Sequence, residues 1–318
     1  MPRVPNDALE TVVFLYGSRA DAESGRKNGA SGFTVAHPWS RGFDYHVYVV
    51  TSRHCVEGRA TTTIRAMRQT DDGSKTVFKD TVESEWILHD DYDVAIYLWK
   101  DAKEVAATIS NGLLQRSEME SLDIGPGEDV YIVARFIHHD GGQRNVPIVH
   151  TGIVSMLPLE PIRNPHTKKN EYDFLVETHS RGGYSGSPVT LYIMPEQVKM
   201  GSARNVGPQI LILGAMWGHF NTFEPVLDPE IKGDDKTTRF VVRSATMVAG
   251  VVPSWEILDL MNGERATNDR DQEEQDRIER SIAATPDTEA VLDSVDTITP
   301  TENLMRDLLQ VPKDEAED

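Results

Sequence analysis

Short segments rich in Val, Ile, Thr, Tyr and Phe recur along the chain between residues 10 and 262, with Gly, Pro, Asn and Asp between them. Such segments are typical of β-strands separated by turns. Six precede and six follow a connector at 101–127, which predicts an all-β fold of two six-stranded barrels, at about 10–100 and 128–250. A β-sandwich fits the same spacing almost as well. The segments are 11–16, 32–36, 45–51, 61–67, 82–88, 93–99, 129–137, 146–155, 172–177, 188–193, 209–217 and 238–243.

The charge of the chain is strongly negative and unevenly distributed. The 318 residues carry a net charge of −19, and residues 263–318 contribute −11 of it, with 17 Asp and Glu against 6 Lys and Arg. An excess of negative charge disfavours non-specific binding to nucleic acid or to anionic membranes. No apolar run reaches the roughly 18 residues of a membrane-spanning helix. We therefore predict neither nucleic acid nor a membrane as a partner.

The C-terminal part of the chain changes character after residue 262. A helix is predicted at 253–262, with Trp255, Leu258 and Met261 on its apolar side and Gly263 at its end. The polar segment 264–298 is predicted to be a solvated helix or a disordered linker. The sequence thus predicts a domain at 1–262, followed by an acidic tail at 263–318.

A further short helix is predicted within the tail, at 300–310. Thr299 and Glu302 form a capping box, with Pro300 at the first helical position. The helix would present an apolar stripe that could dock on the body of the protein, on another subunit or on a partner. A flexible acidic extension is the alternative interpretation. The apolar residues of the stripe are Leu304, Met305, Leu308 and Leu309.

Three motifs supply histidine, aspartate and serine in that order along the chain. They are Arg53-His54-Cys55, Asp93-Val94-Ala95-Ile96 and Gly183-Tyr184-Ser185-Gly186-Ser187-Pro188. A serine hydroxyl becomes a nucleophile when an adjacent imidazole accepts its proton. The imidazole in turn needs a carboxylate that fixes its tautomer. The order His, Asp, Ser separates this chain from the two α/β arrangements that carry the same groups in other orders. Asp90 and Asp91 compete with Asp93 for the role of the carboxylate.

Together these motifs resemble those of the trypsin/chymotrypsin-like serine proteases of the bacterial type, which include glutamyl endopeptidases and high-temperature-requirement proteases. Gly29–Val35, Thr151–Ser155 and Met247–Leu258 extend the resemblance, which covers roughly residues 10–262. It implies two antiparallel six-stranded Greek-key β-barrels with a C-terminal helix. It also implies a serine endopeptidase that hydrolyses protein or peptide substrates through an acyl-enzyme, without a metal or cofactor.

The resemblance assigns a role to each matching residue. Ser185 is the nucleophile, His54 the general base that later protonates the leaving amine, and Asp93 the group that orients His54. The backbone N–H groups of Gly183 and Ser185 form the oxyanion hole. Further residues contact the substrate: one set forms the strand that pairs with its backbone, and the other the base of the specificity pocket. These are Met216, Trp217 and Gly218, and His179 and Ser180, respectively.

Two departures from the family pattern carry consequences. Tyr184 precedes the nucleophile, where animal enzymes have an aspartate that pairs with a new N-terminus, so that activation route is not expected. The pocket base has no aspartate, which disfavours a preference for Lys or Arg. Tyr184 and the acidic tail also motivate an alternative function. In it the chain is a latent or inactive protease-fold protein that acts as a regulated binding or scaffold module.

The remaining features have simpler interpretations. Cys55 is the single cysteine, so no internal disulfide can form. This fact and the absence of an apolar signal segment predict a cytoplasmic protein. His138-His139-Asp140 is interpreted as a hairpin tip rather than a metal site, because adjacent strand residues point to opposite faces. The stretch 163–169 is interpreted as a solvated loop.

Overall fold

The computed structural model describes most of the chain from residue 3 to residue 283. The described residues are 3–25, 29–40, 44–70, 73–100, 102, 105–142, 144–178, 183–193, 209–227 and 237–283. Within them, no helix is both long enough and apolar enough to cross a membrane. The chain divides into two compact units, Met1–Arg270 and Asp271–Asp318.

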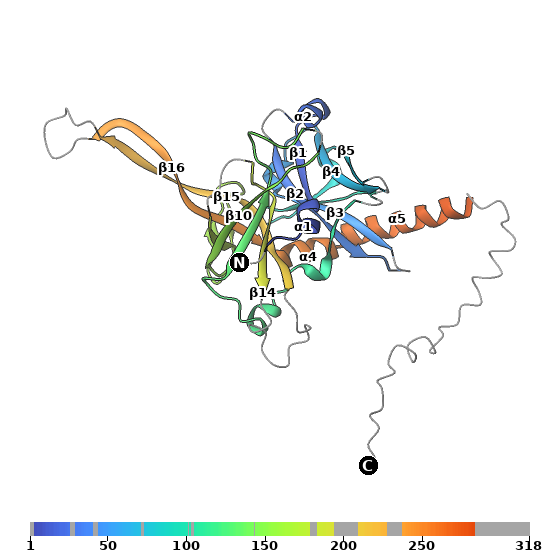
Figure 1. Cartoon of the computed structure of the whole chain (residues 1–318). Coiled ribbons are helices and arrows are strands. Elements are labelled where there is room, and N and C mark those ends of the chain that lie inside the picture. The colour runs from blue at the N-terminus through green and yellow to red at the C-terminus, as the bar shows by residue number, and fades with distance from the viewer. Residues whose placement is uncertain are drawn as a thin grey trace, which may run out of the picture. The chain divides into compact units, whose positions relative to one another are not determined.

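The N-terminal half of the first unit forms one eight-stranded sheet (Figure 1). Its strands follow the order β5-β4-β1-β2-β3-β7-β6, and β8 pairs in parallel with β2. All other pairs in this sheet are antiparallel. The strands are β1 (Val12–Tyr16), β2 (Ala30–Pro38), β3 (Tyr45–Thr51), β4 (Thr62–Thr70), β5 (Gly73–Thr81), β6 (Trp86–Leu88), β7 (Ala95–Leu98) and β8 (Thr108–Ile109).

The C-terminal half of this unit forms a closed barrel of six antiparallel strands in the order β10-β13-β16-β15-β14-β9. A separate small hairpin of two short strands, β11 and β12, lies in the connection between β10 and β13. The bounds are β9 (Asp129–Ala134), β10 (Ile148–Met156), β11 (Ile162–Arg163), β12 (Asn170–Glu171), β13 (Phe174–Thr178), β14 (Ser187–Ile193), β15 (Gln209–Leu227) and β16 (Thr237–Pro253).

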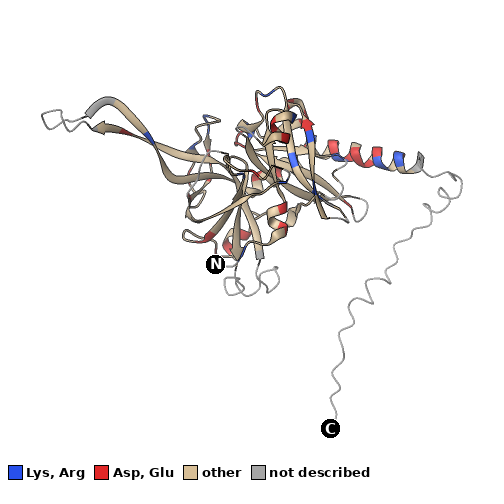
Figure 2. Ribbon diagram, turned by 45° about the horizontal axis from the view of Figure 1, so that its top comes forward, with Lys and Arg blue, Asp and Glu red and all other residues tan. Residues whose placement is uncertain are grey.

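Helices are short except at the end of the described chain. Helix α4 begins after Pro253 and ends at Gly263, and α5 follows directly. Acidic and basic residues are interspersed along α5 (Figure 2), as expected of a helix with a solvated polar surface. The α-helices are α1 (Asn6–Glu10), α2 (Arg19–Ser24), α3 (Glu118–Ser121), α4 (Ser254–Asn262) and α5 (Glu264–Ala283), and the 3-10 turns are η1 (Arg53–Cys55), η2 (Glu83–Glu85) and η3 (Ser110–Gly112).

The central strands of the first sheet are buried on both faces. Phe33 and Val35 of β2 pack in one core cluster with Tyr48 and Val50 of β3, while Val49 lies between them in a second cluster. The side chains of a strand alternate between its two faces, so one strand contributes to both cores. Burial of each such side chain stabilises the fold by about 1.5–3 kcal/mol. The two cores hold the end of β3 in place, where the candidate site begins.

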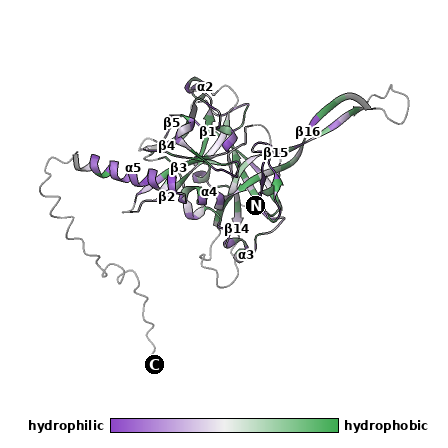
Figure 3. Ribbon diagram, turned by 180° about the vertical axis from the view of Figure 1, so that it is seen from behind, coloured by the Kyte–Doolittle hydropathy of each residue, from purple (hydrophilic) through white to green (hydrophobic). Residues whose placement is uncertain are grey.

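Strands β15 and β16 continue beyond the barrel as a two-stranded arm (Figure 1). The described part of the arm exposes apolar side chains, which appear as green segments in Figure 3. Phe223 is 66% exposed, and the consecutive residues Phe240, Val241 and Val242 are more than half exposed. Residues 216–218 of β15, which are predicted to pair with the substrate backbone, are called the substrate wall below. Strand β15 therefore extends well beyond this wall.

The structure confirms the predicted all-β fold with a closed six-stranded barrel and C-terminal helices. Strands β5 and β8 and the length of the β15–β16 arm were not predicted. Of the alternatives for 264–298, residues 264–283 are helical. The helix predicted at 300–310 lies outside the described residues, and the division at 262 stays a prediction.

His138-His139-Asp140 lies in the connection between the paired strands β9 and β10, as predicted. Asp140 is nevertheless buried, because only 4% of its surface is accessible and Arg65 and Arg135 both lie within ion-pair distance. Buried charges in proteins require such partners. The sequence pattern around His138 and His139 gives no indication of this pairing, because the two arginines belong to distant segments.

Candidate active site

The ends of two paired strands bring His54 and Asp93 together. His54 lies in η1, directly after β3, and Asp93 lies just before β7, which pairs with β3 through Thr51 and Ala95. His54 Nδ1 donates to Asp93 Oδ2 at 2.6 Å, and the His54 backbone N–H donates to Asp93 Oδ1 at 2.9 Å. Two bonds to one carboxylate fix both the tautomer and the orientation of the imidazole.

The surroundings of His54 favour its charged form. Asp93 is fully buried, and its carboxylate lies against the imidazole. Burial lowers the pKa of His54, but the hydrogen bond that it donates to Asp93, together with the effect of the neighbouring Cys55, outweighs burial, so the pKa is raised to about 10. Glu171 Oε2 accepts a hydrogen bond from the Asp93 backbone N–H at 3.2 Å. Glu171 thus fixes the backbone of Asp93, the residue whose carboxylate faces His54.

The loop that carries Ser185 is shaped by two glycines and held by β2. Gly183 and Gly186 have φ angles of +94° and +84°, a region that L side chains rarely adopt. A Cβ atom on Gly186 would lie 2.1 Å from the Ser31 carbonyl oxygen. The Ser31 backbone N–H donates to the Ser185 carbonyl, and its hydroxyl donates to the Gly183 carbonyl, each at 2.9 Å. The spacing of the glycines in the motif therefore has a steric reason.

The Ser185 hydroxyl faces the neighbouring strand rather than His54. Ser185 Oγ donates to the Trp217 carbonyl oxygen at 2.9 Å. His54 Nε2, the nitrogen not bound by Asp93, lies 3.6 Å from Cys55 Sγ. Among the hydrogen bonds between described residues, none joins Ser185 to His54. Of the three predicted catalytic residues, His54 and Asp93 are hydrogen-bonded to each other, whereas Ser185 is hydrogen-bonded to the Trp217 carbonyl on the neighbouring strand.

The predicted substrate wall lies on β15 beside the Ser185 loop. Met216 is buried, and its carbonyl oxygen accepts from the Gly186 backbone N–H at 2.7 Å. Trp217 Nε1 donates to the buried carboxylate of Asp173 at 2.8 Å. Gly218 follows at the point where β15 leaves its pairing with β14. His179 and Ser180, the predicted pocket base, lie outside the described residues.

Tyr184, the departure from the family pattern, points into the core of the barrel. Only 2% of its surface is accessible, and it packs with Val189 and Met216 in the barrel core. Its hydroxyl forms a 2.6 Å hydrogen bond with His150 Nε2. The bulky side chain is thus accommodated in the barrel core, where Met216 of the wall is one of its neighbours.

The β11–β12 hairpin places the ring of His166 on the ring of His54. The rings of His166 and His54 are stacked, with centroids 3.8 Å apart and planes 8° from parallel. His166 also meets the edge of the Trp217 ring, at 5.9 Å between centroids. Residues 163–169 are mostly exposed, as predicted for a solvated loop, but they form the turn of this hairpin and bring His166 onto His54. Asn164 is fully buried in this turn, and no local pattern indicates that its neighbours reach His54.

Among the described residues, His54, Asp93 and His166 form a group of potential metal ligands. One such atom of each lies within 4.8 Å of the others. The two rings are nearly parallel, so their nitrogen lone pairs do not converge on one point. Asp93 already accepts from His54 on both oxygens. Zinc needs ligand atoms that surround it tetrahedrally, and this arrangement favours proton transfer over metal binding.

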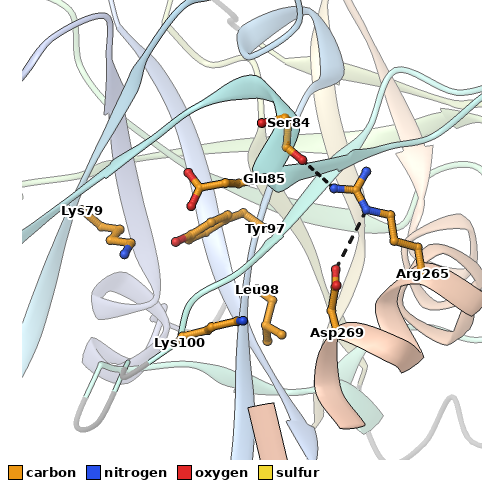
Figure 4. A pocket seen from close by; sticks show the side chains of 8 residues that line it. All are labelled: Lys79, Ser84, Glu85, Tyr97, Leu98, Lys100, Arg265 and Asp269. Atoms are coloured by element: carbon orange, nitrogen blue, oxygen red, sulfur yellow. Dashed lines mark hydrogen bonds and ion pairs between the residues drawn. The ribbon is translucent and has the colours of Figure 1, made fainter. Parts of the chain in front are cut away.

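A pocket of the first unit lies elsewhere and shares no residue with this group. It has a volume of about 290 Å³, and Arg265 spans its side to reach the Ser84 carbonyl at 2.6 Å and Asp269 at 3.9 Å (Figure 4). Lysines and carboxylates make up much of its lining. The lining residues are Lys79, Ser84, Glu85, Tyr97, Leu98, Lys100, Arg265 and Asp269.

Comparisons with known proteins found a family match and similar solved structures. Residues 30–191 match the trypsin-like peptidase domain. Similar solved structures include the MamO protease domain from Magnetospirillum magneticum in its apo form, with 14% identity and a TM-score of 0.42 over 80% of this chain and 97% of that one. Another is the inactive form of the Rv3671c protease of M. tuberculosis, with 13% identity and a TM-score of 0.40 over 80% and 89%. No curated protein matches the chain.

Proposed function

The chain belongs to the trypsin-like peptidase domain family, and from this premise we propose that it is a serine endopeptidase with His54, Asp93 and Ser185 as its triad. One observation carries the proposal above the others. Asp93 holds His54 at two points, through Nδ1 and through the backbone N–H, and is itself fully buried. A histidine held in this way keeps Nε2 as the nitrogen available for proton transfer.

The reaction begins with a rotation of the Ser185 side chain. Its hydroxyl leaves the Trp217 carbonyl oxygen and turns to neutral His54, which accepts the proton as Oγ attacks the peptide carbonyl. The backbone N–H groups of Gly183 and Ser185 stabilise the oxyanion. His54 then passes its proton to the leaving amine. Water, deprotonated by His54, hydrolyses the acyl-enzyme and restores Ser185.

We assign substrate contacts to the wall beside the nucleophile. Residues Met216, Trp217 and Gly218 would pair with the backbone of a protein or peptide on the amino side of the scissile bond. His179 and Ser180 would form the base of the specificity pocket. We assign this domain to 1–262 and the tail to 263–318, where the segment 300–310 is either part of a flexible acidic extension or a docking element. The lone Cys55 favours a reducing compartment, and the cytoplasm is the proposed location.

The test of this function is proteolysis of an unfolded protein such as reduced casein, with fragments identified by mass spectrometry. We expect the unmodified chain to generate fragments and Ser185→Ala to generate none, because loss of a triad serine lowers kcat by about 10⁶-fold. Ser24→Ala, an exposed serine at the end of α2, is the matched control and should cleave like the parent chain. Equal cleavage by Ser185→Ala would refute the assignment.

A second candidate is a latent protease-fold module that binds its partners without cleaving them. The bond from Ser185 Oγ to the Trp217 carbonyl favours it, because a nucleophile engaged there is not activated. The raised pKa of His54 also favours it, since a charged imidazole accepts no proton. The two candidates differ in whether Ser185 of the intact protein reacts with a small electrophile.

A further inference from the structure

His166 lies between the candidate base and the candidate substrate wall. Its ring covers one face of His54 and meets the edge of Trp217. Its Nε2 atom lies 3.6 Å from the position that a Cβ atom on Gly218 would occupy. The side chain is exposed to solvent on its remaining side. One residue of the hairpin connection therefore touches both the base and the wall.

The backbone that carries His166 is firmly held. The side chain of the buried residue Asn164 accepts from the His166 backbone N–H at 2.8 Å and donates to Glu171 at 3.0 Å. Glu171 in turn accepts from the Asp93 backbone N–H. On the exposed side, Lys169 Nζ donates to Asp91 Oδ1 at 2.9 Å. The turn is thus tied to the segment around Asp93, so His166 belongs to a fixed element rather than a loose loop.

The position of His166 can be compared with the path of an extended substrate bound at the candidate site. The scissile carbonyl must lie at Ser185, and the substrate on its amino side must run along 216–218. Successive side chains of an extended strand point to opposite sides. If the side chain of the scissile residue enters the pocket behind the wall, that of the preceding residue points toward His54. His166 already occupies the space between His54 and Trp217.

We propose that His166 fills the subsite for the substrate residue that precedes the scissile residue, so that this protease selects glycine or another very small residue there. The proposal rests on the proposed endopeptidase function. His166 acts by its volume. Burial, the nearby His54 and Lys168 lower its pKa, so it remains neutral beside a charged His54 and does not repel it.

The direct test uses pairs of fluorogenic peptides that differ only at this position, glycine against phenylalanine, built on a cleavage site found in casein. We expect the parent chain to favour the glycine peptide, and His166→Ala to raise kcat/KM for the phenylalanine peptide by roughly tenfold or more. The glycine peptide should change less than about twofold. His166→Phe refills the space and should restore the exclusion. Lys168→Gly, at a φ of +61° in the same turn, is the control for loop effects.

Binding separates this proposal from the question of catalysis. The same peptide pair is titrated by calorimetry against Ser185→Ala and against Ser185→Ala combined with His166→Ala. We expect the preference for glycine, as a ratio of Kd values, to fall by roughly tenfold in the double variant. An equal ratio in both proteins, or no peptide binding by either, would overturn the subsite. Binding without turnover by the parent chain would refute the endopeptidase and leave the subsite standing.

Discussion

The first unit contains two clusters of buried charged residues, one at the candidate site and one remote from it. The two clusters differ in how an excess of buried charge of one sign is accommodated. The carboxylate cluster consists of Asp93, Glu171 and Asp173, beside His54. The arginine cluster consists of Arg65, Arg135 and Asp140, and it joins the first sheet to the barrel. Each contains more charge of one sign than of the other. Only one of them can relieve the excess by gaining or losing a proton.

In the arginine cluster the charges are permanent and the contacts are many. Asp140 lies 3.4 Å from Arg65 and 3.2 Å from Arg135. Arg65 also donates to the Asp140 carbonyl oxygen at 2.8 Å and to Asn145 Oδ1 at 2.8 Å. Burial raises the pKa of Asp140, but Tyr16 and the two arginines outweigh this and lower it. Because arginine stays protonated at any ordinary pH, this cluster is a structural joint.

In the carboxylate cluster the surroundings favour protonation. Burial raises the pKa of Glu171. Burial and the nearby Glu171 raise the pKa of Asp173 well above its usual range. Among the described residues, Asp173 Oδ1 has no hydrogen-bond partner. Titratable groups with displaced pKa values are typical of catalytic sites. The arginine cluster is thus a structural contact whose charges do not change with pH, whereas the protonation of the carboxylate cluster depends on pH.

The largest expected effect is at the center of the carboxylate cluster. Asp93→Asn keeps the shape of the side chain but removes the charge that orients His54 and stabilises its protonated form. We expect kcat to fall by about 10⁴-fold, as for the equivalent change in a well-studied triad. Peptide hydrolysis at saturating substrate measures it. Asp91→Asn, at an exposed carboxylate paired with Lys169, is the control and should stay near the parent value.

The arginine cluster should respond in stability instead. Asp140→Ala leaves two fully buried guanidinium groups without their shared carboxylate. We expect the free energy of unfolding to fall by about 3–5 kcal/mol, measured by urea denaturation. His139→Ala, at the exposed neighbour, should change it by less than about 0.5 kcal/mol. Equal effects of the two substitutions would mean that the cluster is not a joint.

The pH dependence of activity tests the charge on His54. Its pKa is raised from 6.5 to about 10, and it must be neutral to accept the Ser185 proton. We expect kcat/KM to rise with pH well above 6.5, toward that value. A profile of kcat/KM against pH on a peptide substrate measures this. An activity that is already constant from about pH 6.5 upward would show an ordinary histidine.

The smallest effect concerns Asp173. Its pKa in the folded protein is raised above the unfolded value, so its stabilising contribution is complete below the unfolded pKa and is lost as pH rises through the folded pKa. Asp173→Asn is neutral at every pH and escapes this loss. We expect the unfolding free energy of the variant to increase relative to that of the parent as pH rises above the ordinary aspartate pKa of about 4, by at most about 1.4 kcal/mol per pH unit. A constant difference would argue against a protonated Asp173.

The sequence predicted strands rich in apolar residues, including the exposed residues 240–242, and missed β5, in which polar residues predominate. The segment 45–51 coincides with β3, because its apolar run reflects burial on both faces. Strand β5 was not predicted because it lies at the edge of the sheet and most of its side chains are partly exposed, so its sequence contains few apolar residues. The arm of β15 and β16 has no core to bury, so residues such as Asn221 and Glu224 carry no strand signal.

The candidate site shows the same division between local and long-range information. His54, Asp93 and Ser185 were found because each lies in a short motif with its own residue requirements, such as the glycines at 183 and 186. His166 and Glu171 were missed because their roles come from the packing of a hairpin more than 70 residues after Asp93 in sequence. No local spacing in the segment 162–171 encodes that contact.

The central claim is that Ser185 is a nucleophile assembled with His54 and Asp93. Reaction of the intact protein with a fluorophosphonate, read by intact mass, tests it most directly because the reagent needs no knowledge of the substrate. The account predicts a single adduct on the parent chain and none on Ser185→Ala. An absence of adduct on the parent chain, across the pH range in which His54 is neutral, would contradict it and favour the latent module.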